Sequence, residues 1–177
     1  VVAASEAATG DETATVDEPT ITTASRDPAF RDETARSGVD FRGPASKEKR
    51  YILESVSGGV ALLDLDGDEH LDLFLVGSLT VATRDQPERG RSTLYRGLGD
   101  GRFEDVSARS GADIAGWGVG VCAGDVDGDG LVDLYVTGVE RNWLLRNRGD
   151  LRFEEIAAEA GALGGGWSTG CGFADAD

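Results

Sequence analysis

The sequence contains no methionine, one histidine and two cysteines, and it has no long apolar run. The missing methionine indicates that Val1 is not a translation start, so we expect a processed chain or a fragment. A membrane-spanning helix needs roughly 20 apolar residues, and no run approaches that length. Two cysteines are too few for a disulfide framework. A single histidine without a partner constellation offers no acid–base or nucleophilic site, so we expect no enzyme activity.

Basic residues are also scarce, with 17 Lys and Arg against 33 Asp and Glu, which gives a net charge of −16. Nucleic acids and anionic membranes attract basic surfaces, so this balance argues against both as partners. Much of the acidity gathers in DLDGDEHLD (64–72) and DVDGDGLVD (125–133), with aspartates at positions 1, 3, 5 and 9. Carboxylates this close repel one another unless a cation neutralises them, and Ca²⁺ takes 6–8 oxygen ligands.

We therefore predict two calcium loops with equivalent ligands. Side chains at positions 1, 3 and 5 would converge on the ion, a main-chain carbonyl at position 7 would add an oxygen, and position 9 would close the shell. The predicted ligands are Asp64, Asp66, Asp68, His70 and Asp72 in the first loop, and Asp125, Asp127, Asp129, Leu131 and Asp133 in the second. A third loop begins at Asp175 and Asp177.

The spacing of these aspartates also suggests an EF-hand, which the flanking residues exclude. An EF-hand loop needs a glutamate at position 12 and a helix on each side. Position 12 is Leu75 or Val136, and both flanks are rich in β-branched residues and glycine. We therefore predict β-hairpin loops. Glu69 stands where the second loop has Gly130, so the first loop should bind calcium more weakly or carry backbone strain.

The loops belong to an internal repeat. Phe103 and Phe153, like Trp117 and Trp167, are 50 residues apart. The clearest copy parses into four short strands, at 117–126, 131–139, 142–147 and 151–157, and this pattern is typical of a β-propeller blade. We predict an all-β fold of antiparallel four-stranded blades over residues 29–177. The repeats run over 57–113 and 117–163, and a third starts at 167–177, with a polar surface loop inserted at 78–92. Residues 1–28, rich in Ala, Thr and acids, read as a disordered leader.

The segments GVALLDLDGDEHLDLFLVGS and GVGVCAGDVDGDGLVDLYVTG resemble the FG-GAP/VCBS repeat of integrin α-subunit propellers and many secreted bacterial proteins. FRDETARSGVDF and KRYILESVSGGVALLDLDGD are more narrowly similar to the bacterial relatives of cartilage acidic protein, the ASPIC/UnbV group. The resemblance implies about two and a half blades of a seven- or eight-bladed propeller.

The same resemblance implies structural calcium, a secreted or extracytoplasmic location, and adhesion through an unidentified protein or carbohydrate ligand. The alternative function is part of a propeller polysaccharide lyase or hydrolase, in which carboxylates and calcium would assist catalysis. A third possibility is a structural spacer in a larger surface protein.

Three further signals have more than one interpretation. Arg148-Gly149-Asp150 spells an integrin-recognition tripeptide, but it falls where a hairpin turn is predicted. Trp117 and Trp167 indicate either packing between blades or a sugar-stacking platform. The glycines at 116, 118 and 120, and at 164–166, indicate close packing of inner strands rather than a phosphate-binding loop.

The two cysteines lie in equivalent inner strands but one register apart. Cys122 and Cys171 therefore take opposite faces, and because adjacent blades pack unlike faces together, a bridge between them is conceivable. Two buried free thiols are nevertheless the favoured interpretation. The ring of His70 is expected in solvent.

Overall fold

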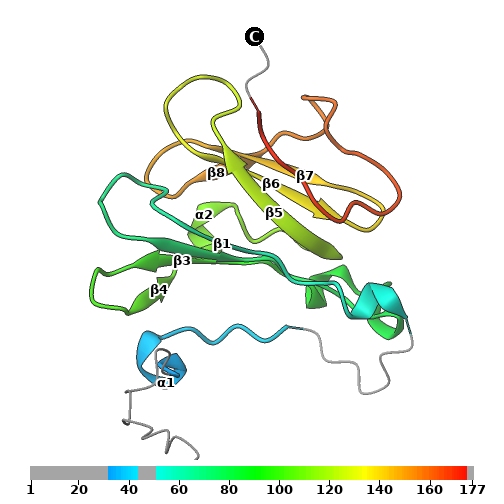
Figure 1. Cartoon of the computed structure of the whole chain (residues 1–177), viewed down its shortest axis with the longest axis horizontal. Helices are drawn as coiled ribbons and strands as arrows, with labels where there is room; N and C mark the ends of the chain where they lie inside the picture. Colours follow the sequence, from blue (N-terminus) through cyan, green and yellow to red (C-terminus); the bar gives the residue numbers. More distant parts are fainter. Residues whose placement is uncertain (1–31, 44–50, 175–177) are drawn as a thin grey trace, which may run out of the picture. The chain divides into compact units, whose positions relative to one another are not determined.

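The prediction of an all-β fold is confirmed by the computed structural model, which describes residues 32–43 and 51–174 (Figure 1). The described strands form two antiparallel sheets, each with its four strands in chain order. The first sheet contains β1 (Val60–Leu63), β2 (Asp72–Leu75), β3 (Thr93–Gly97) and β4 (Phe103–Asp105). The second contains β5 (Gly118–Gly124), β6 (Asp133–Gly138), β7 (Trp143–Asn147) and β8 (Phe153–Glu155). The predicted leader, and Asp175 and Asp177, lie outside the described residues.

Short helical turns connect the strands. The helices α1 (Thr34–Ser37) and α2 (Ser107–Ser110) have four residues each, and the 3-10 turns are η1 (Ile52–Glu54), η2 (Val81–Thr83) and η3 (Pro87–Arg89). The turns η2 and η3 lie within the inserted segment 78–92. None of the described helices has the length and apolar character to cross a membrane.

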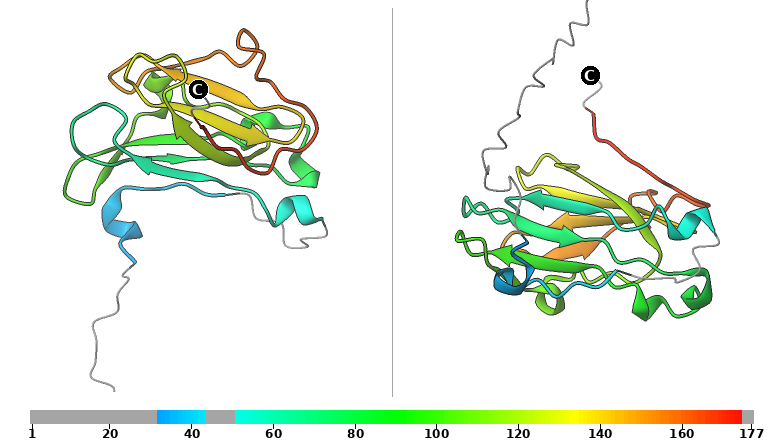
Figure 2. Two further views of the ribbon diagram at one scale, coloured as in Figure 1. Left: turned by 45° about the horizontal axis from the view of Figure 1, so that its top comes forward. Right: turned by 60° about the horizontal axis from the view of Figure 1, so that its bottom comes forward.

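The main hydrophobic core lies between the two sheets (Figures 1 and 2). Strand alternation sends one set of side chains from each sheet into it. Phe74 and Leu94 of the first sheet, and Leu134 and Leu145 of the second, have no exposed surface. Burying such a side chain stabilises a fold by about 1.5–3 kcal/mol, so this contact holds the two sheets together.

Glycine lets the inner strands approach closely. A Cβ atom on Gly118 of β5 would lie 2.3 Å from Cγ1 of Val76, and one on Gly59 would lie 2.9 Å from the backbone of Gly120. Neither position has room for a side chain. The close-packing interpretation of the glycine-rich run is therefore confirmed at Gly118.

The two short helices are copies of one another and dock in the same way. Each ends at a glycine with a left-handed backbone, Gly38 (φ 80°) and Gly111 (φ 74°). A Cβ on Gly38 would lie 2.7 Å from the carbonyl oxygen of Phe103 in β4, and a Cβ on Gly111 would lie 2.4 Å from that of Phe153 in β8. Each helical segment thus packs against the outer strand of the sheet that follows it in the chain. The two segments also share sequence, since TARSG at residues 34–38 matches SARSG at residues 107–111.

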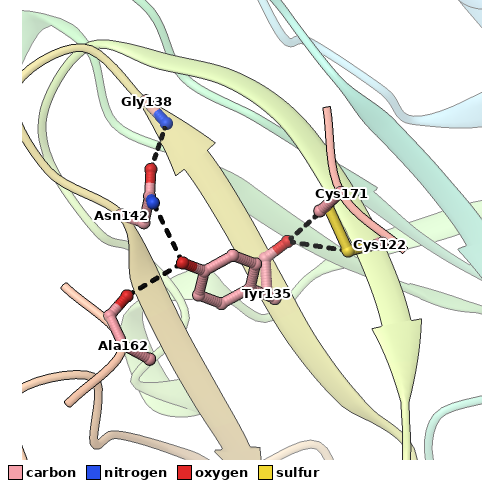
Figure 3. Close-up of a disulfide and its surroundings, with 6 residues drawn as sticks. All are labelled: Cys122, Tyr135, Gly138, Asn142, Ala162 and Cys171. Carbon is pink, nitrogen blue, oxygen red and sulfur yellow. Dashed lines mark hydrogen bonds between the residues drawn. A yellow bond between two sulfur atoms is a disulfide. The ribbon is translucent and has the colours of Figure 1, made fainter. Parts of the chain in front are cut away.

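The favoured interpretation of Cys122 and Cys171 as free thiols is wrong, because they form a disulfide (Figure 3). Their Cα atoms are 5.9 Å apart, within the range that a disulfide bridges. Cys122 lies in β5 as predicted, whereas Cys171 lies in a described segment that forms no strand, so the prediction of two equivalent inner strands holds for Cys122 alone. The sulfur atoms lie 3.8 and 3.6 Å from the carbonyl oxygen of Tyr135. These are close contacts rather than hydrogen bonds, since a disulfide carries no S–H.

Tyr135 also connects the second sheet to the segment that follows it (Figure 3). Its hydroxyl donates to the carbonyl of Ala162 (2.8 Å) and accepts from the side-chain amide of Asn142 (2.9 Å). Asn142 in turn accepts from the backbone N–H of Gly138 (2.9 Å). Further along, Phe173 packs edge-on against the Tyr135 ring. The segment that starts the third repeat therefore lies against the second sheet through the disulfide and these aromatic contacts.

Gly111→Ala should destabilise the protein more than Gly161→Ala. The two positions are 50 residues apart and both have positive φ, so alanine costs about 1–2 kcal/mol of backbone strain at either site. Only at Gly111 would the new Cβ also meet another strand, since nothing lies within 4 Å of Gly161. Overpacking adds about 1–3 kcal/mol. Urea unfolding would measure the difference, and equal losses would contradict the docking of α2 on β8.

Reduction of the Cys122–Cys171 disulfide should release the segment after β8. A disulfide closing a loop of 49 residues typically contributes about 2–4 kcal/mol. We expect dithiothreitol to lower the melting temperature and to expose residues 163–174 to limited proteolysis. The Cys122→Ser/Cys171→Ser protein is the control, since dithiothreitol should leave it unchanged. Equal proteolysis of oxidised and reduced wild type would show that the bond does not hold this segment.

Candidate metal centre

Both predicted acidic loops connect the first two strands of a sheet. Residues 64–71 join β1 to β2, and residues 125–132 join β5 to β6. The strands are paired antiparallel in register, with Leu63 opposite Asp72 and Gly124 opposite Asp133. The prediction of β-hairpin loops rather than helix-flanked EF-hands is thus confirmed for the described residues.

Each loop brings three of its aspartates together. Carboxylate oxygens of Asp64, Asp66 and Asp72 lie within 4.8 Å of one another, and the same holds for Asp125, Asp127 and Asp133. Two oxygens bound to one Ca²⁺ at about 2.4 Å can be at most about 4.8 Å apart, so both groups have dimensions that fit the ion. The donor atoms are all carboxylate oxygens, which suit hard cations such as Ca²⁺, Mg²⁺ and Mn²⁺.

The first aspartate of each loop organises the backbone of the turn. Asp125 accepts hydrogen bonds from the N–H groups of Gly128 (2.7 Å), Asp129 (3.2 Å) and Gly130 (2.9 Å). These bonds, chiefly that from Gly130, lower the pKa of Asp125. Asp64 makes the equivalent bonds to Gly67 (2.7 Å) and Glu69 (2.9 Å). The backbone N–H groups of each turn therefore point at the carboxylate of its first aspartate.

The last aspartate of each loop fastens it to the third strand. Asp72 has no exposed surface, and it accepts from the N–H of Leu65 in the loop (3.0 Å) and of Gly97 at the end of β3 (2.9 Å). Asp133 is equally buried and accepts from Val126 (2.8 Å) and Asn147 (2.7 Å). One carboxylate in each sheet thus joins the hairpin loop to the following strand.

Burial raises the pKa of Asp72 and of Asp133, and the nearby loop aspartates raise it further, whereas the backbone N–H groups act against both effects. A carboxyl whose folded-state pKa exceeds its unfolded value stabilises the fold below the unfolded pKa. That contribution is lost as pH rises through the folded pKa. The fold therefore disfavours the ionised form of both carboxyl groups, and a bound cation would offset this cost.

Four predicted ligands lie outside the two carboxylate groups. The carboxylate of Asp68 accepts from the N–H of His70 (2.9 Å), and that of Asp129 accepts from the N–H of Leu131 (2.8 Å). Whether these residues contribute oxygens to an ion stays a prediction. The His70 residue is exposed, and its ring lies beside Gly99.

The strain predicted for the first loop is present. Glu69 has φ 67°, whereas the equivalent Gly130 has φ 86°. A left-handed backbone costs a residue with a side chain about 1–2 kcal/mol and costs glycine little. The weaker calcium binding predicted for this loop remains untested.

Two residues beside the loops were not predicted from the sequence. Asn147 donates its side-chain amide to the carbonyl of Leu65 (2.9 Å) in the first acidic loop, and to that of Val132 (3.1 Å) in the second. Arg96 of β3 forms ion pairs with Asp66 (3.2 Å) and Asp68 (2.7 Å). Two signals in the sequence could have revealed them. One is an asparagine at the end of an apolar strand, and the other is an arginine that recurs after 50 residues, as Arg96 and Arg146.

The remaining sequence signals have structural explanations. The Arg148-Gly149-Asp150 tripeptide forms the turn between β7 and β8, and Arg148 is paired with Glu154. Trp117 is 7% exposed, as packing predicts. Trp167 is 42% exposed, so the sugar-stacking alternative stays open there alone.

The geometry defines a class of protein: a repeat of four-stranded antiparallel blades, each with an acidic hairpin between its first two strands. Comparison with known families agrees, because the FG-GAP-like repeat matches residues 64–136 and 125–177. The chain belongs to the FG-GAP-like repeat family. No curated protein matches it.

Replacement of Asp133 by Asn should destabilise the protein even without metal. Asparagine presents one oxygen where two N–H groups need acceptors, so either Val126 or Asn147 would lose its bond. An unsatisfied buried donor costs about 1–3 kcal/mol. Chemical unfolding in EDTA would measure this loss. Asp127→Asn is the matched control and should change metal-free stability by less than about 0.5 kcal/mol, since Asp127 is exposed. Equal losses would contradict the fastening role of Asp133.

Proposed function

We propose that this chain is a calcium-binding FG-GAP-like repeat module of a secreted or cell-surface protein, which binds a protein or carbohydrate ligand. Calcium is structural in this proposal, and the chain is not an enzyme. The observation that carries it is the recurrence of one carboxylate group, Asp64–Asp66–Asp72 and Asp125–Asp127–Asp133, at equivalent places in two blades. A single acidic turn is common on protein surfaces, but two equivalent turns of the same geometry favour a shared ligand.

The proposed role of calcium follows from the residues that would hold it. Asp72 and Asp133 each bridge the hairpin loop and the third strand, so an ion bound to them would tie three elements of the blade together. The ion would supply positive charge beside carboxylates whose burial is otherwise costly. Asp68, His70, Asp129 and Leu131 would complete the two shells, and Asp175 and Asp177 would begin a third.

Further blades are part of the proposal. Val121 of β5 packs into the core between the two sheets. The equivalent Val60 of β1 is 62% exposed, and Leu62 on the same face is 54% exposed. An apolar sheet face of this kind is what a neighbouring blade covers in a propeller. We propose a ring of seven or eight blades, of which residues 29–177 form about two and a half.

The location proposed rests on the disulfide. Disulfides persist in oxidising surroundings such as the extracellular space or periplasm, and Cys122–Cys171 is such a bond. Relationship to the ASPIC/UnbV group is the narrower proposal within the family, supported by the segment at residues 32–40 that docks through Gly38.

The alternative function is part of a polysaccharide lyase or hydrolase. Incubation with acidic polysaccharides, followed at the absorbance of unsaturated products, would reveal eliminative cleavage and overturn the non-enzymatic proposal.

Calcium should raise the melting temperature of the protein. At a free calcium concentration 100 times the dissociation constant, each site adds about 2.7 kcal/mol to the free energy of unfolding. For a chain of this size that corresponds to about 5–10 °C per site. Differential scanning calorimetry in EDTA and in calcium would measure the shift, and isothermal titration would count the sites.

The control for this experiment is the Asp66→Asn/Asp127→Asn protein. It loses one carboxylate charge from each group, so calcium should raise its melting temperature much less than that of wild type. Equal melting curves of wild type in EDTA and calcium, together with no bound calcium in the titration, would exclude the proposal.

A further inference from the structure

The two acidic loops have equivalent sequences but unequal surroundings. In each sheet the third strand carries an arginine at the same place, Arg96 in β3 and Arg146 in β7. Each lies opposite a glutamate of the fourth strand, Glu104 and Glu154 respectively. The two blades therefore share an arginine–glutamate pair beside the loop, and this pair is arranged differently in each blade.

In the first blade the arginine is turned toward the loop. The guanidinium of Arg96 lies 3.2 Å from a carboxylate oxygen of Asp66 and donates to Asp68 at 2.7 Å. The Asp66 side chain is only 10% exposed, so the pair is partly shielded from water. Glu104 pairs with Arg109 at 3.8 Å instead. Arg96 thus neutralises a carboxylate that belongs to the first metal-binding group.

In the second blade the arginine is shared. Arg146 reaches Asp127 at 3.6 Å, and it donates to Glu154 at 3.1 Å. Glu154 also holds Arg148. The Asp127 side chain is 35% exposed, so water screens its longer contact with Arg146 more effectively. The second loop therefore keeps more of its negative charge available for a cation.

We propose that Arg96 is an internal competitor of calcium in the first loop, so that the second loop binds calcium more tightly although the two carboxylate groups match. This inference rests on the calcium sites proposed above. The guanidinium of Arg96 contacts one carboxylate oxygen of Asp66 and places a positive charge next to the proposed position of the ion. Binding a divalent cation there must overcome that repulsion, whereas Arg146 is divided between Asp127 and Glu154 and makes the longer contact with the loop. In metal-free protein the same arginine holds the first loop together.

The test compares the Asp127→Asn protein with the Arg96→Gln/Asp127→Asn protein. Because Asp127→Asn weakens the second site, the titration then measures calcium binding at the first loop. Isothermal titration should show calcium affinity rising about three- to tenfold when the arginine is removed, as expected for one unit charge a few ångströms from the ion in a partly screened site. The strain at Glu69 is present in both proteins and does not affect the comparison.

Two further variants separate charge from structure. Arg96→Lys keeps the positive charge, so its calcium affinity should stay close to that of wild type. Arg146→Gln, measured in the Asp66→Asn background, should change the affinity of the second loop by less than about twofold. In EDTA, Arg96→Gln should lower the melting temperature more than Arg146→Gln, because the metal-free first loop loses its counter-charge.

The outcomes are distinguishable. Absence of calcium binding by wild type would refute the proposed function and this inference with it. Calcium binding by wild type, with unchanged or weaker affinity in Arg96→Gln, would refute the inference alone and assign Arg96 a purely ordering role. If Arg96→Gln unfolds in EDTA, competition between the calcium-loaded protein and a chelator of known calcium affinity, carried out in parallel with the loaded Asp127→Asn protein that keeps Arg96, gives the same comparison.

Discussion

The structure depends on one repeated interaction: a buried aspartate that accepts two backbone N–H groups from different parts of the blade. Asp72 and Asp133 each close a hairpin loop and hold it against the third strand. Since buried backbone donors must find acceptors, this one side chain satisfies two that the sheet ladder cannot reach. The interaction comes at the cost of a desolvated charge, and repulsion by the neighbouring loop carboxylates adds to that cost, which a cation could balance.

The loops and the sheets could be predicted from the sequence because both follow from local patterns. Alternating apolar residues fix the strands, and aspartates at alternate positions around Gly67 and Gly128 fix a turn that wraps onto its first side chain. The observed strands start and end within a few residues of the predicted ones. The second strand begins at Asp133 rather than at 131, because the loop continues until the aspartate that closes it.

What could not be predicted depends on distances between elements far apart in the chain. The faces of Cys122 and Cys171 follow from strand alternation, but nothing local states that their Cα atoms lie 5.9 Å apart. The same holds for Asn147, whose amide reaches the carbonyl of Leu65, 82 residues away in the acidic loop of the first blade. Arg96 was missed for a related reason, since its partners become neighbours only when β3 pairs with β2.

The repeat shows which residues take the place of the disulfide in the preceding inter-blade contact. By the alignment of the aspartate loops, Cys122 corresponds to Ala61 and Cys171 to Val121, and these two residues pack at the core between the first and second sheets. The same pair of positions is therefore apolar in one inter-blade contact and covalent in the next. The first contact has a shared core of fully buried side chains. In the second, Phe173 lies against Tyr135 and Gly124 beside the disulfide. The two contacts are therefore stabilised in different ways: the apolar pair by burial in the folded chain, and the disulfide mainly by lowering the entropy of the unfolded chain.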